Sequence, residues 1–374
     1  MRIGIVCHPT YGGSGVMATE LGNFLAKKGH VIHLISHSMP VRLNPFHGNI
    51  NFHEVYIDPY PLFHHQPYEV ALASSIVETV KREKLDVLHV HYAIPHAYAA
   101  YMATQILKDQ NIIIPFITTL HGTDITLVGK NPAYKPAVSF SINHSSYVTA
   151  VSESLKKDTE ELFDLKNSIE VIPNFVNLKG YDREPKDNRK YFANDNETIF
   201  CHVSNFRPVK RVLDVIKVFK KVQDQRNSVL IMVGDGPDRN IAEKLSRDLG
   251  IWDKVIFRGK TYDVQSMLGI SDIFLLPSST ESFGLSALEA MASHVPVIAS
   301  NVGGLSEVVD HDKNGFLENI GDVESMAEDA LSLIDNKEKM INFSNSAREK
   351  AESFSMNEIS QRYLELYQKL INEK

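Results

Sequence analysis

The chain has 374 residues, of which 43% are hydrophobic and 23% are charged. A single core rarely grows past about 250 to 300 residues, so this length predicts two domains. The formal net charge of −7 argues against nucleic acid as the main partner, because that function needs a basic surface. No run approaches the ~20 apolar residues of a membrane-spanning helix.

The N-terminal stretch MRIGIVCHPTYGG has one basic residue and a short apolar run. This pattern is typical of a first β-strand and not of a signal peptide. The two cysteines, Cys7 and Cys201, fall in apparently buried strands far apart in the sequence. Buried free thiols are typical of a reducing compartment, so the sequence predicts a cytoplasmic protein.

Short β-branched runs alternate with helical patterns through the first half of the chain. The predicted strands are 3–7, 31–35, 87–90, 116–120, 148–151 and 169–172, and the predicted helices include 17–28, 72–84 and 98–108. This alternation is typical of βαβ units and a parallel sheet. The first half therefore predicts a Rossmann-like α/β domain over residues 1–175.

Residues 178–197 interrupt this alternation, because they are polar, charged and poor in aliphatic side chains, which favours a linker. The alternation then restarts and predicts a second Rossmann-like domain over residues 176–355. Its predicted strands are 198–203, 229–233, 255–258, 273–276 and 295–299, and its helices include 212–223 and 240–249. The last stretch, 356–374, predicts an amphipathic helix. Its apolar face consists of Ile359, Tyr363, Leu366, Tyr367 and Leu370.

A glycine-rich turn follows the first predicted strand. In GGSGVMATEL, Gly13, Gly15 and Ala18 satisfy the G-x-G-x-x-A pattern of a dinucleotide site. A nicotinamide site also needs an acid about 20 residues later, and the second strand ends in LISHSMP without one. The free N–H groups of this turn still favour an anion near Gly13, Ser14 and Gly15, with a plain tight turn as the alternative.

Two acids, Glu281 and Glu289, flank the predicted start of a helix in ESFGLSALEAMA. A helix N-terminus attracts negative charge, whereas carboxylates beside a phosphate would repel it. We therefore expect these acids to accept hydrogen bonds from hydroxyl groups on either side of a diphosphate, as in a nucleotide sugar. The alternative is a helix-start acid and a solvated helix residue.

A cluster of cations follows the first strand of the second half. Arg207, Lys210 and Arg211 in SNFRPVKRV would lie at the carboxyl end of a parallel strand, where open α/β sheets bind ligands. Such cations can neutralise a diphosphate and the charge that develops as it leaves. Solvated loop cations are the alternative. Glycines in GDGPDR and FRGK end the next strands and would allow a ligand to approach closely.

Together these stretches resemble the family 4 glycosyltransferases of the GT-B fold over nearly the whole chain. The most specific match is the E-x7-E motif formed by Glu281 and Glu289, and GGSG, PVIAS followed by NVGG, and the NG at 314–315 also match. The resemblance implies two doubly wound, parallel-sheet domains that face a cleft, with the helix 356–374 packed back on the first domain. The family usually has an arginine where Asn205 stands, and here Arg207 follows two residues later.

The stretches GGSGVMATELG, HYAIPHA, TTLHGTDIT, SNFRPVKRV and VGDGP are similar to those of family members that glycosylate L-malate. This resemblance implies a retaining transfer of N-acetylglucosamine from UDP-N-acetylglucosamine to L-malate, the first step of bacillithiol biosynthesis. It implies no metal or other cofactor, and it leaves a homo-oligomer open. Many relatives glycosylate membrane lipids, but residues 1–170 carry 13 Lys/Arg against 15 Asp/Glu and no basic amphipathic helix, which favours a soluble acceptor and no membrane partner. The pair His89 and His91 has no third metal ligand at a recognisable spacing. Another small-molecule or lipid acceptor, or a non-catalytic nucleotide-sugar sensor, is the alternative.

The resemblance also implies roles for particular residues. The expected catalytic residues are His121, Arg207, Lys210 and Glu281. The expected donor-binding residues are Gly15, Asn205, Arg211, Gly234, Gly236, Arg258, Phe283, Gly284, Leu285 and Glu289. Because malate carries two carboxylates that need N–H groups, hydroxyls and a cation, the expected acceptor-binding residues are Gly13, Ser14, Arg42, Tyr92, Thr119 and Asn174. Asp124 either belongs to the site or caps the segment that follows it.

Overall fold

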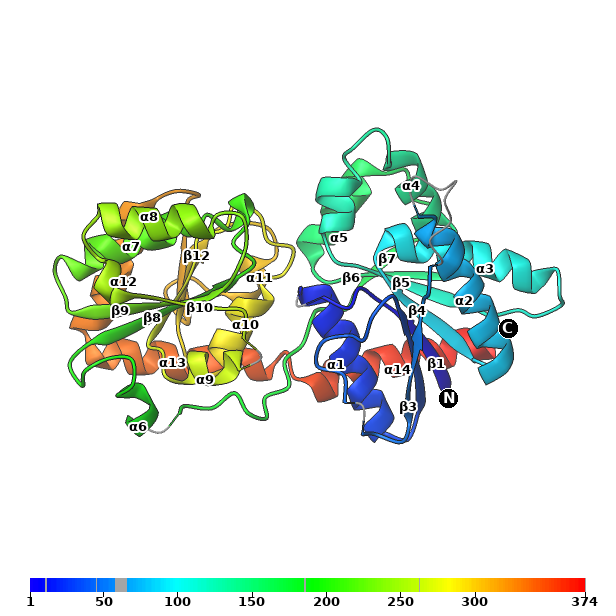
Figure 1. The fold of residues 1–374 in the computed structure, drawn as a ribbon, viewed down its shortest axis with the longest axis horizontal. Coiled ribbons are helices and arrows are strands. Elements are labelled where there is room, and N and C mark those ends of the chain that lie inside the picture. The colour runs from blue at the N-terminus through cyan, green and yellow to red at the C-terminus, as the bar shows by residue number, and fades with distance from the viewer. Residues whose placement is uncertain (11, 45, 58–65, 185, 262, 374) are drawn as a thin grey trace. The chain divides into compact units, whose positions relative to one another are not determined.

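The computed structural model of the chain describes all residues except 11, 45, 58–65, 185, 262 and 374. The chain divides into two compact units, which Figure 1 colours along the sequence. Unit 1 comprises Met1–Asn174 and Met356–Lys374, and unit 2 comprises Phe175–Ser355. The division therefore lies one residue before the boundary expected from the sequence.

Unit 1 is built on a seven-stranded sheet with the order β3-β2-β1-β4-β5-β6-β7. All neighbouring strands are parallel, which confirms the doubly wound architecture. The strand order reverses between β1 and β4, and this switch point is where open α/β sheets bind ligands. The strands are β1 (Arg2–Val6), β2 (Val31–Ser36), β3 (Ile50–Glu54), β4 (Val87–His91), β5 (Phe116–Leu120), β6 (Tyr147–Ala150) and β7 (Ile169–Val171).

Helices cover both faces of this sheet, because successive strand residues point to opposite sides. Leu88 and Val90 of β4 belong to the apolar cluster under α2 and α3, whereas His89 contacts Tyr367 of α14 on the other face. Helix α1 packs with α14 on that second face. The helices are α1 (Gly13–Lys27), α2 (Tyr68–Glu83), α3 (Tyr98–Lys108), α4 (Lys135–Asn143), α5 (Glu153–Leu162) and α14 (Met356–Asn372), with helical turns η1 (Ala93–Ala97) and η2 (Thr123–Val128).

The amphipathic pattern of the C-terminal stretch explains why α14 packs on unit 1. All five apolar residues of its predicted face are buried. The chain thus passes through unit 2 and then returns to complete unit 1.

Unit 2 is built on a six-stranded parallel sheet with the order β10-β9-β8-β11-β12-β13. Its strand order reverses between β8 and β11, so unit 2 has a switch point of the same kind. The strands are β8 (Thr198–Ser204), β9 (Ser228–Gly234), β10 (Val255–Gly259), β11 (Ile273–Leu276), β12 (Val297–Ser300) and β13 (Gly315–Glu318).

The helices of unit 2 also lie on both faces of its sheet. Helices α7 and α12 pack together over a core that includes Phe200, Phe219 and Met326, whereas α10 packs with α9 and α13. The helices are α6 (Lys186–Arg189), α7 (Val212–Gln223), α8 (Arg239–Asp248), α9 (Val264–Gly269), α10 (Leu285–Ala292), α11 (Leu305–Val308), α12 (Val323–Asp335) and α13 (Lys337–Glu352), with helical turns η3 (Pro208–Lys210) and η4 (Trp252–Lys254).

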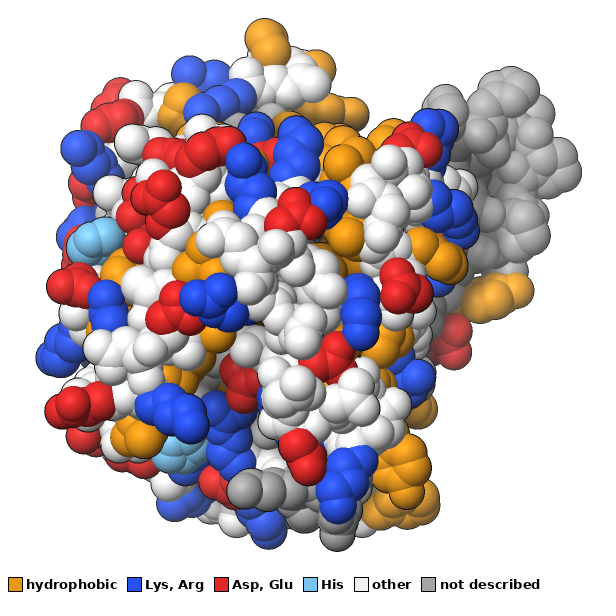
Figure 2. Space-filling view, turned by 90° about the vertical axis from the view of Figure 1, so that its left-hand side faces the viewer, with side chains coloured by type: hydrophobic (Ala, Val, Ile, Leu, Met, Phe, Trp, Pro, Cys, Tyr) orange, Lys and Arg blue, Asp and Glu red, His pale blue; other side chains and the backbone are white. Residues whose placement is uncertain are grey.

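Both cysteines are buried free thiols, as the sequence predicted. Burial raises the pKa of Cys7 and of Cys201 to about 12, so both are inert core residues. Among the described residues, no helix is both long and apolar enough to cross a membrane. Figure 2 shows basic and acidic side chains interspersed on the face that it presents. This face therefore lacks the single-sign field that attracts nucleic acid.

Candidate functional site

The switch point of unit 2 carries a buried ion pair. Lys210 ends the turn η3 that follows β8, and Glu281 lies in the loop that follows β11. The Nζ of Lys210 donates to Oε1 of Glu281 over 2.5 Å, and the two side chains are only 20% and 10% exposed. The two predicted residues thus meet at the carboxyl ends of the two strands that flank the switch point.

Further contacts orient this ion pair. Ser278 donates its hydroxyl to the same Oε1 of Glu281 over 2.8 Å, so two donors share one carboxylate oxygen. His202 of β8 is buried nearby, and its ring bonds to Ser204 Oγ and to the carbonyl oxygen of Leu275. Burial, with Lys210 adding to the effect, lowers the pKa of His202 to about 4. A neutral imidazole therefore lies near the ion pair without a hydrogen bond to it among the described residues, and the sequence reasoning missed both Ser278 and His202.

The second acid of the motif, Glu289, lies on α10 and is only 7% exposed. Tyr181 donates its hydroxyl to Oε1 of Glu289 over 2.6 Å. Tyr181 falls in the segment interpreted as a linker, which contains Tyr181, Tyr191 and Phe192 among polar neighbours. Of these three aromatic residues only Tyr181 is buried in the structure, and the sequence gives no sign of which one. The contact holds the segment after residue 175 against the acid motif.

The NVGG turn after β12 packs directly on the backbone of Glu281. The N–H of Gly304 donates to the carbonyl oxygen of Glu281 over 3.0 Å. Gly303 has a φ of +52°, and a Cβ there would lie 1.9 Å from the same oxygen. Only glycine fits this approach, so the turn fixes the backbone of the acid that pairs with Lys210.

Arg207 and Asn205 lie in the loop between β8 and η3, and both are exposed. Their position after a switch-point strand makes them available to a ligand. Arg211 instead donates from Nε to Oδ2 of Asp214 over 2.7 Å at the start of α7. Its side chain is engaged in this helix-start ion pair, which does not support the donor-binding role expected for Arg211.

The other expected donor-binding residues of unit 2 have mixed environments. The guanidinium of Arg258 lies 5.7 Å from the centre of the Phe192 ring. A Cβ on Gly234 would lie 1.8 Å from the carbonyl oxygen of Ser204, and a Cβ on Gly236 would lie 2.0 Å from that of Asn205. These glycines therefore allow two loops to pack together, which accounts for them without the ligand approach that the sequence analysis expected.

The remaining expected donor-binding residues lie at the start of α10. Gly284 has a φ of +94° and precedes the helix. Phe283 is buried against Phe354, and Leu285 is half-buried.

In unit 1 the glycine turn lies at the switch point and starts α1. Gly13 is exposed and Ser14 is buried. A Cβ on Gly15 would lie 2.5 Å from the carbonyl oxygen of His8. This close approach of α1 to the end of β1 leaves the first N–H groups of a 15-residue helix at the strand ends, which favours an anion there.

Histidine and tyrosine rings gather at the same end of the unit 1 sheet. His91 ends β4, and its Nδ1 lies 2.8 Å from Nε2 of His121, which follows β5. Tyr92 stacks on His121 with ring centres 5.6 Å apart. The Asp124 carboxylate is fully buried and accepts hydrogen bonds from the N–H groups of Ala93, His121 and Gly122. Asp124 therefore holds the two loops together, which is a structural role but not the cap on the following segment that the sequence analysis considered.

Thr119 lies inside the core of unit 1 and not at a surface. It is 1% exposed, and its hydroxyl is within hydrogen-bond distance of His89, Thr149 and Tyr363. These contacts engage the Thr119 hydroxyl within the core and do not support its expected role as an acceptor-binding residue. Arg42 has a φ of +65° and is partly exposed, with its carbonyl oxygen bonded to Asn23. Asn174 is 9% exposed at the end of the first segment of unit 1.

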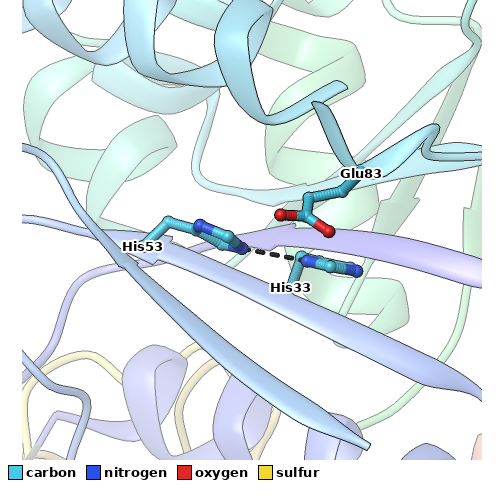
Figure 3. Close-up of side chains that lie close together, drawn as sticks. All are labelled: His33, His53 and Glu83. Carbon is cyan, nitrogen blue, oxygen red and sulfur yellow. Dashed lines mark hydrogen bonds between the residues drawn. The ribbon is translucent and has the colours of Figure 1, made fainter. Parts of the chain in front are cut away.

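A second histidine cluster joins β2, β3 and α2 of unit 1. Nδ1 of His33 and Nε2 of His53 are 2.9 Å apart, and Figure 3 shows the two rings facing each other beside the Glu83 carboxylate. Ligand atoms of these three residues lie within 4.8 Å of one another, which is a spacing that could hold a metal ion. No sequence spacing had indicated this group, because strand pairing brings its members together.

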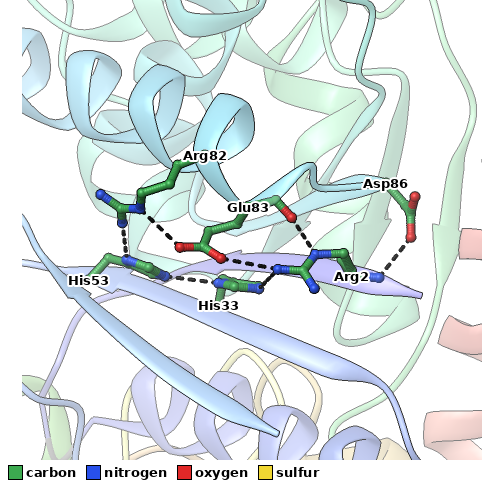
Figure 4. Close-up of polar contacts among 6 residues, drawn as sticks. All are labelled: Arg2, His33, His53, Arg82, Glu83 and Asp86. Atoms are coloured by element: carbon green, nitrogen blue, oxygen red, sulfur yellow. Dashed lines mark hydrogen bonds and ion pairs between the residues drawn. The ribbon is translucent and has the colours of Figure 1, made fainter.

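Two arginines argue against a metal at this place. Arg82 donates to Oε1 of Glu83 over 2.9 Å and approaches Nδ1 of His53 at 2.9 Å, and Arg2 donates to Oε2 of Glu83 over 3.0 Å (Figure 4). A divalent cation at this place would be repelled by two guanidinium groups. These two groups also already neutralise the only carboxylate among the three candidate ligands. We interpret this cluster as a structural network that joins β1, β2, β3 and α2.

Comparisons with known proteins agree on one family. The family described as Glycosyltransferase Family 4 matches residues 11–179, and that described as Glycosyl transferases group 1 matches residues 183–350. The chain is 43% identical to the N-acetyl-alpha-D-glucosaminyl L-malate synthase of Bacillus anthracis, across 100% of this chain and 98% of that relative.

Solved structures share the fold at lower identity. Anabaena Alr3699/HepE in complex with UDP and glucose superposes with a TM-score of 0.83 at 21% identity, covering 98% of this chain and 99% of that one. Sucrose-phosphate synthase from Thermosynechococcus elongatus superposes with a TM-score of 0.81 at 19% identity over the whole of both chains. The fold, with two Rossmann-like units in one chain, is thus common to all three.

Proposed function

Because this chain belongs to the family 4 glycosyltransferases, we propose that it transfers N-acetylglucosamine from UDP-N-acetylglucosamine to L-malate in the cytoplasm. The full-length 43% identity to a malate-glycosylating relative supports this choice of donor and acceptor. The reaction would supply the first intermediate of bacillithiol biosynthesis. The observation that carries the proposal is the Lys210–Glu281 pair at the switch point of unit 2.

Lys210 and Arg207 would bind the diphosphate of the donor. An ammonium group has three N–H donors, and Lys210 uses one for Glu281, so two remain for phosphate oxygens. Arg207 is exposed three residues earlier and adds a second cation. These two charges would stabilise the UDP that leaves, a task that requires no metal in this proposal.

The two acids would recognise hydroxyl groups of the donor. Ser278 and Lys210 both donate to Oε1 of Glu281, so Oε2 would accept from a sugar hydroxyl. Tyr181 fixes Glu289 in the same manner, so that Glu289 can accept from the ribose. Since both carboxylates are already bound and oriented, we assign neither as a covalent nucleophile.

A front-face path to retention fits these roles. The bond between the sugar and UDP breaks, the malate hydroxyl oxygen bonds to the same face of the anomeric carbon, and the departing phosphate takes the hydroxyl proton. The transition state then resembles an oxocarbenium ion beside a diphosphate, so catalysis depends on positioning and charge stabilisation. In unit 1, the N–H groups of the Gly13–Gly15 turn and the Ser14 hydroxyl would bind a malate carboxylate.

Release of UDP in the presence of different acceptors tests this function. With UDP-N-acetylglucosamine as donor, we expect rapid UDP release only when L-malate is added, and D-malate serves as the matched control. Release that requires a lipid acceptor would replace malate with another substrate. Tight donor binding without any turnover would identify a nucleotide-sugar sensor and contradict the enzymatic role.

A further inference from the structure

Two neutral histidines of unit 1 share one hydrogen bond. Nδ1 of His91 and Nε2 of His121 are 2.8 Å apart, with ring centres 5.1 Å apart. Burial lowers the pKa of His121 to about 3 and that of His91 well below its usual value. A neutral imidazole has one N–H and one lone pair. One ring must therefore donate and the other accept, and the direction decides what His121 offers a ligand.

The remaining nitrogen of His91 discriminates between the two directions. Its Nε2 is fully buried and has no hydrogen-bond partner in the described part of the chain. If His121 donated, the proton of His91 would be on Nε2, as a buried N–H without an acceptor. If His91 donates, only a lone pair is left unpaired. Buried unpaired N–H groups are rarer than under-satisfied acceptors in folded proteins, so His91 donates.

The neighbouring His96 shows that this part of the fold accommodates an unpaired lone pair. Nδ1 of His96 bonds to the carbonyl oxygen of His91, and a carbonyl can only accept. The proton of neutral His96 is therefore on Nδ1. Its Nε2 is then a bare lone pair, which is also buried without a partner among the described residues.

We propose that His91 is a positioning residue that holds His121 in the tautomer with its proton on Nδ1, so that His121 donates a hydrogen bond to a substrate oxygen. Nδ1 of His121 has no partner among the described residues, and its side chain is partly exposed. His89 stacks on His91 at 4.3 Å and Tyr92 stacks on His121 at 5.6 Å, which fixes both rings.

This tautomer determines whether His121 can accept a proton during the reaction. His121 with a proton on Nδ1 and an occupied Nε2 has no free lone pair with which to accept a proton from the acceptor hydroxyl. His121 is then a donor that orients or polarises substrate oxygen and is not the general base. This role rests on the proposed glycosyl transfer, whereas the tautomer itself does not.

Nitrogen-15 NMR of histidine-labelled protein tests the tautomer without any assay of activity. Long-range proton–nitrogen correlations distinguish a protonated from an unprotonated ring nitrogen, and His91→Phe and His121→Asn assign the signals. We expect His121 protonated on Nδ1 and His91 protonated on Nδ1 at pH 7. A His121 ring protonated on Nε2 would overturn the proposal, whether or not the protein transfers sugar to malate.

Kinetics of matched variants test the functional part. His121→Asn keeps an N–H donor close to the position of Nδ1, whereas His121→Asp has the same shape and only accepts. We expect Asn to retain at least about tenfold more kcat than Asp, the value of one hydrogen bond. The reverse order would identify His121 as a base and contradict the proposal.

The positioning role of His91 has its own pair of variants. His91→Asn preserves a donor toward His121, and His91→Phe preserves the ring and removes the donor. We expect Phe to lower kcat by about tenfold relative to Asn, with UDP affinity in unit 2 unchanged as the control for folding. Equal kcat for the two variants would refute the positioning role.

The NMR result and the activity result can fail separately. If the NMR spectra show the expected tautomers but the unmodified protein does not turn over with malate, the proposed function is refuted and the tautomer stands.

Discussion

Replacing Lys210 by alanine is expected to lower kcat for sugar transfer by about 10²-fold or more, which corresponds to about 3 kcal/mol of transition-state stabilisation. The reason is electrostatic, because the ammonium group lies at the carboxyl end of β8 in a site where it is only 20% exposed. A charge held in such a place stabilises a leaving diphosphate more than a solvated charge would. Steady-state rates of UDP release with saturating malate measure the effect, and Arg207→Ala should behave similarly.

Two further variants separate catalysis from folding. Lys244→Ala removes an exposed lysine whose partner is Asp248 on the same helix, and its rate should stay near that of the unmodified protein. Lys210→Ala combined with Glu281→Gln removes both charges of the buried pair, which avoids an unpaired carboxylate. This double variant should melt normally and remain slow. Near-normal rates for Lys210→Ala and Arg207→Ala would contradict the role of these cations.

The free energy of unfolding is expected to fall steeply as the pH decreases from 6.5 to about 4. Burial lowers the pKa of His89, His96 and His121 to about 3, and that of His202 to about 4. In the unfolded chain these groups return to an ordinary pKa near 6.5. Between those values the unfolded state binds more protons than the native state, so acid favours unfolding. The stabilisation from neutral burial is fully present above pH 6.5.

The size of this effect decides where the protein unfolds. Each such group contributes a slope of up to about 1.4 kcal/mol per pH unit. Four together give at most about 5.6 kcal/mol per unit, and the Asp329 carboxyl, whose pKa is raised to about 7 chiefly by burial, opposes part of this slope. Over one to two pH units the net loss is comparable with a typical stability of about 5 to 15 kcal/mol. Urea titrations at pH 7.5, 6.5 and 5.5, followed by circular dichroism, measure the slope. His144→Gln, at an exposed position on unit 1, is the control variant, and stability that is the same at pH 7.5 and at pH 5.5 would contradict the expectation.

Most strands could be predicted because central parallel strands are continuous β-branched runs. The two strands that the sequence analysis missed are both at sheet edges. β3 (INFHE) is largely polar and partly exposed along its length, so it lacks the apolar run of a buried strand. β13 has four residues and begins with Gly315, which is depleted in strands. In both cases pairing with a neighbour outweighs local propensity.

The candidate site of unit 2 was predictable where it follows from strand topology. Lys210 and Glu281 come after strands on either side of a reversal in order, and this alone brings them together. Arg211 could not be separated from Lys210 in the sequence. In the structure Arg211 has a left-handed φ of +49° immediately before α7, and its side chain pairs with Asp214 in the first turn of that helix.

Contacts between side chains of different strands were less predictable. Thr118 and Thr119 are both buried in β5, because a central parallel strand is covered on both faces and alternation then carries no information about exposure. The contact between His91 and His121 depends on the register that pairs His91 with Thr119. Tyr181 was missed because its neighbours in the sequence are polar, and this composition predicts an exposed linker.

The most direct test of the whole account is calorimetry of UDP binding to the purified chain and to its Lys210→Ala variant. If cations after β8 bind the diphosphate while Glu289 binds the ribose, one UDP should bind per chain, and the variant should lose at least about tenfold in affinity, as expected for a charge-assisted contact. Absence of UDP binding, or equal affinity in the variant, would contradict the account.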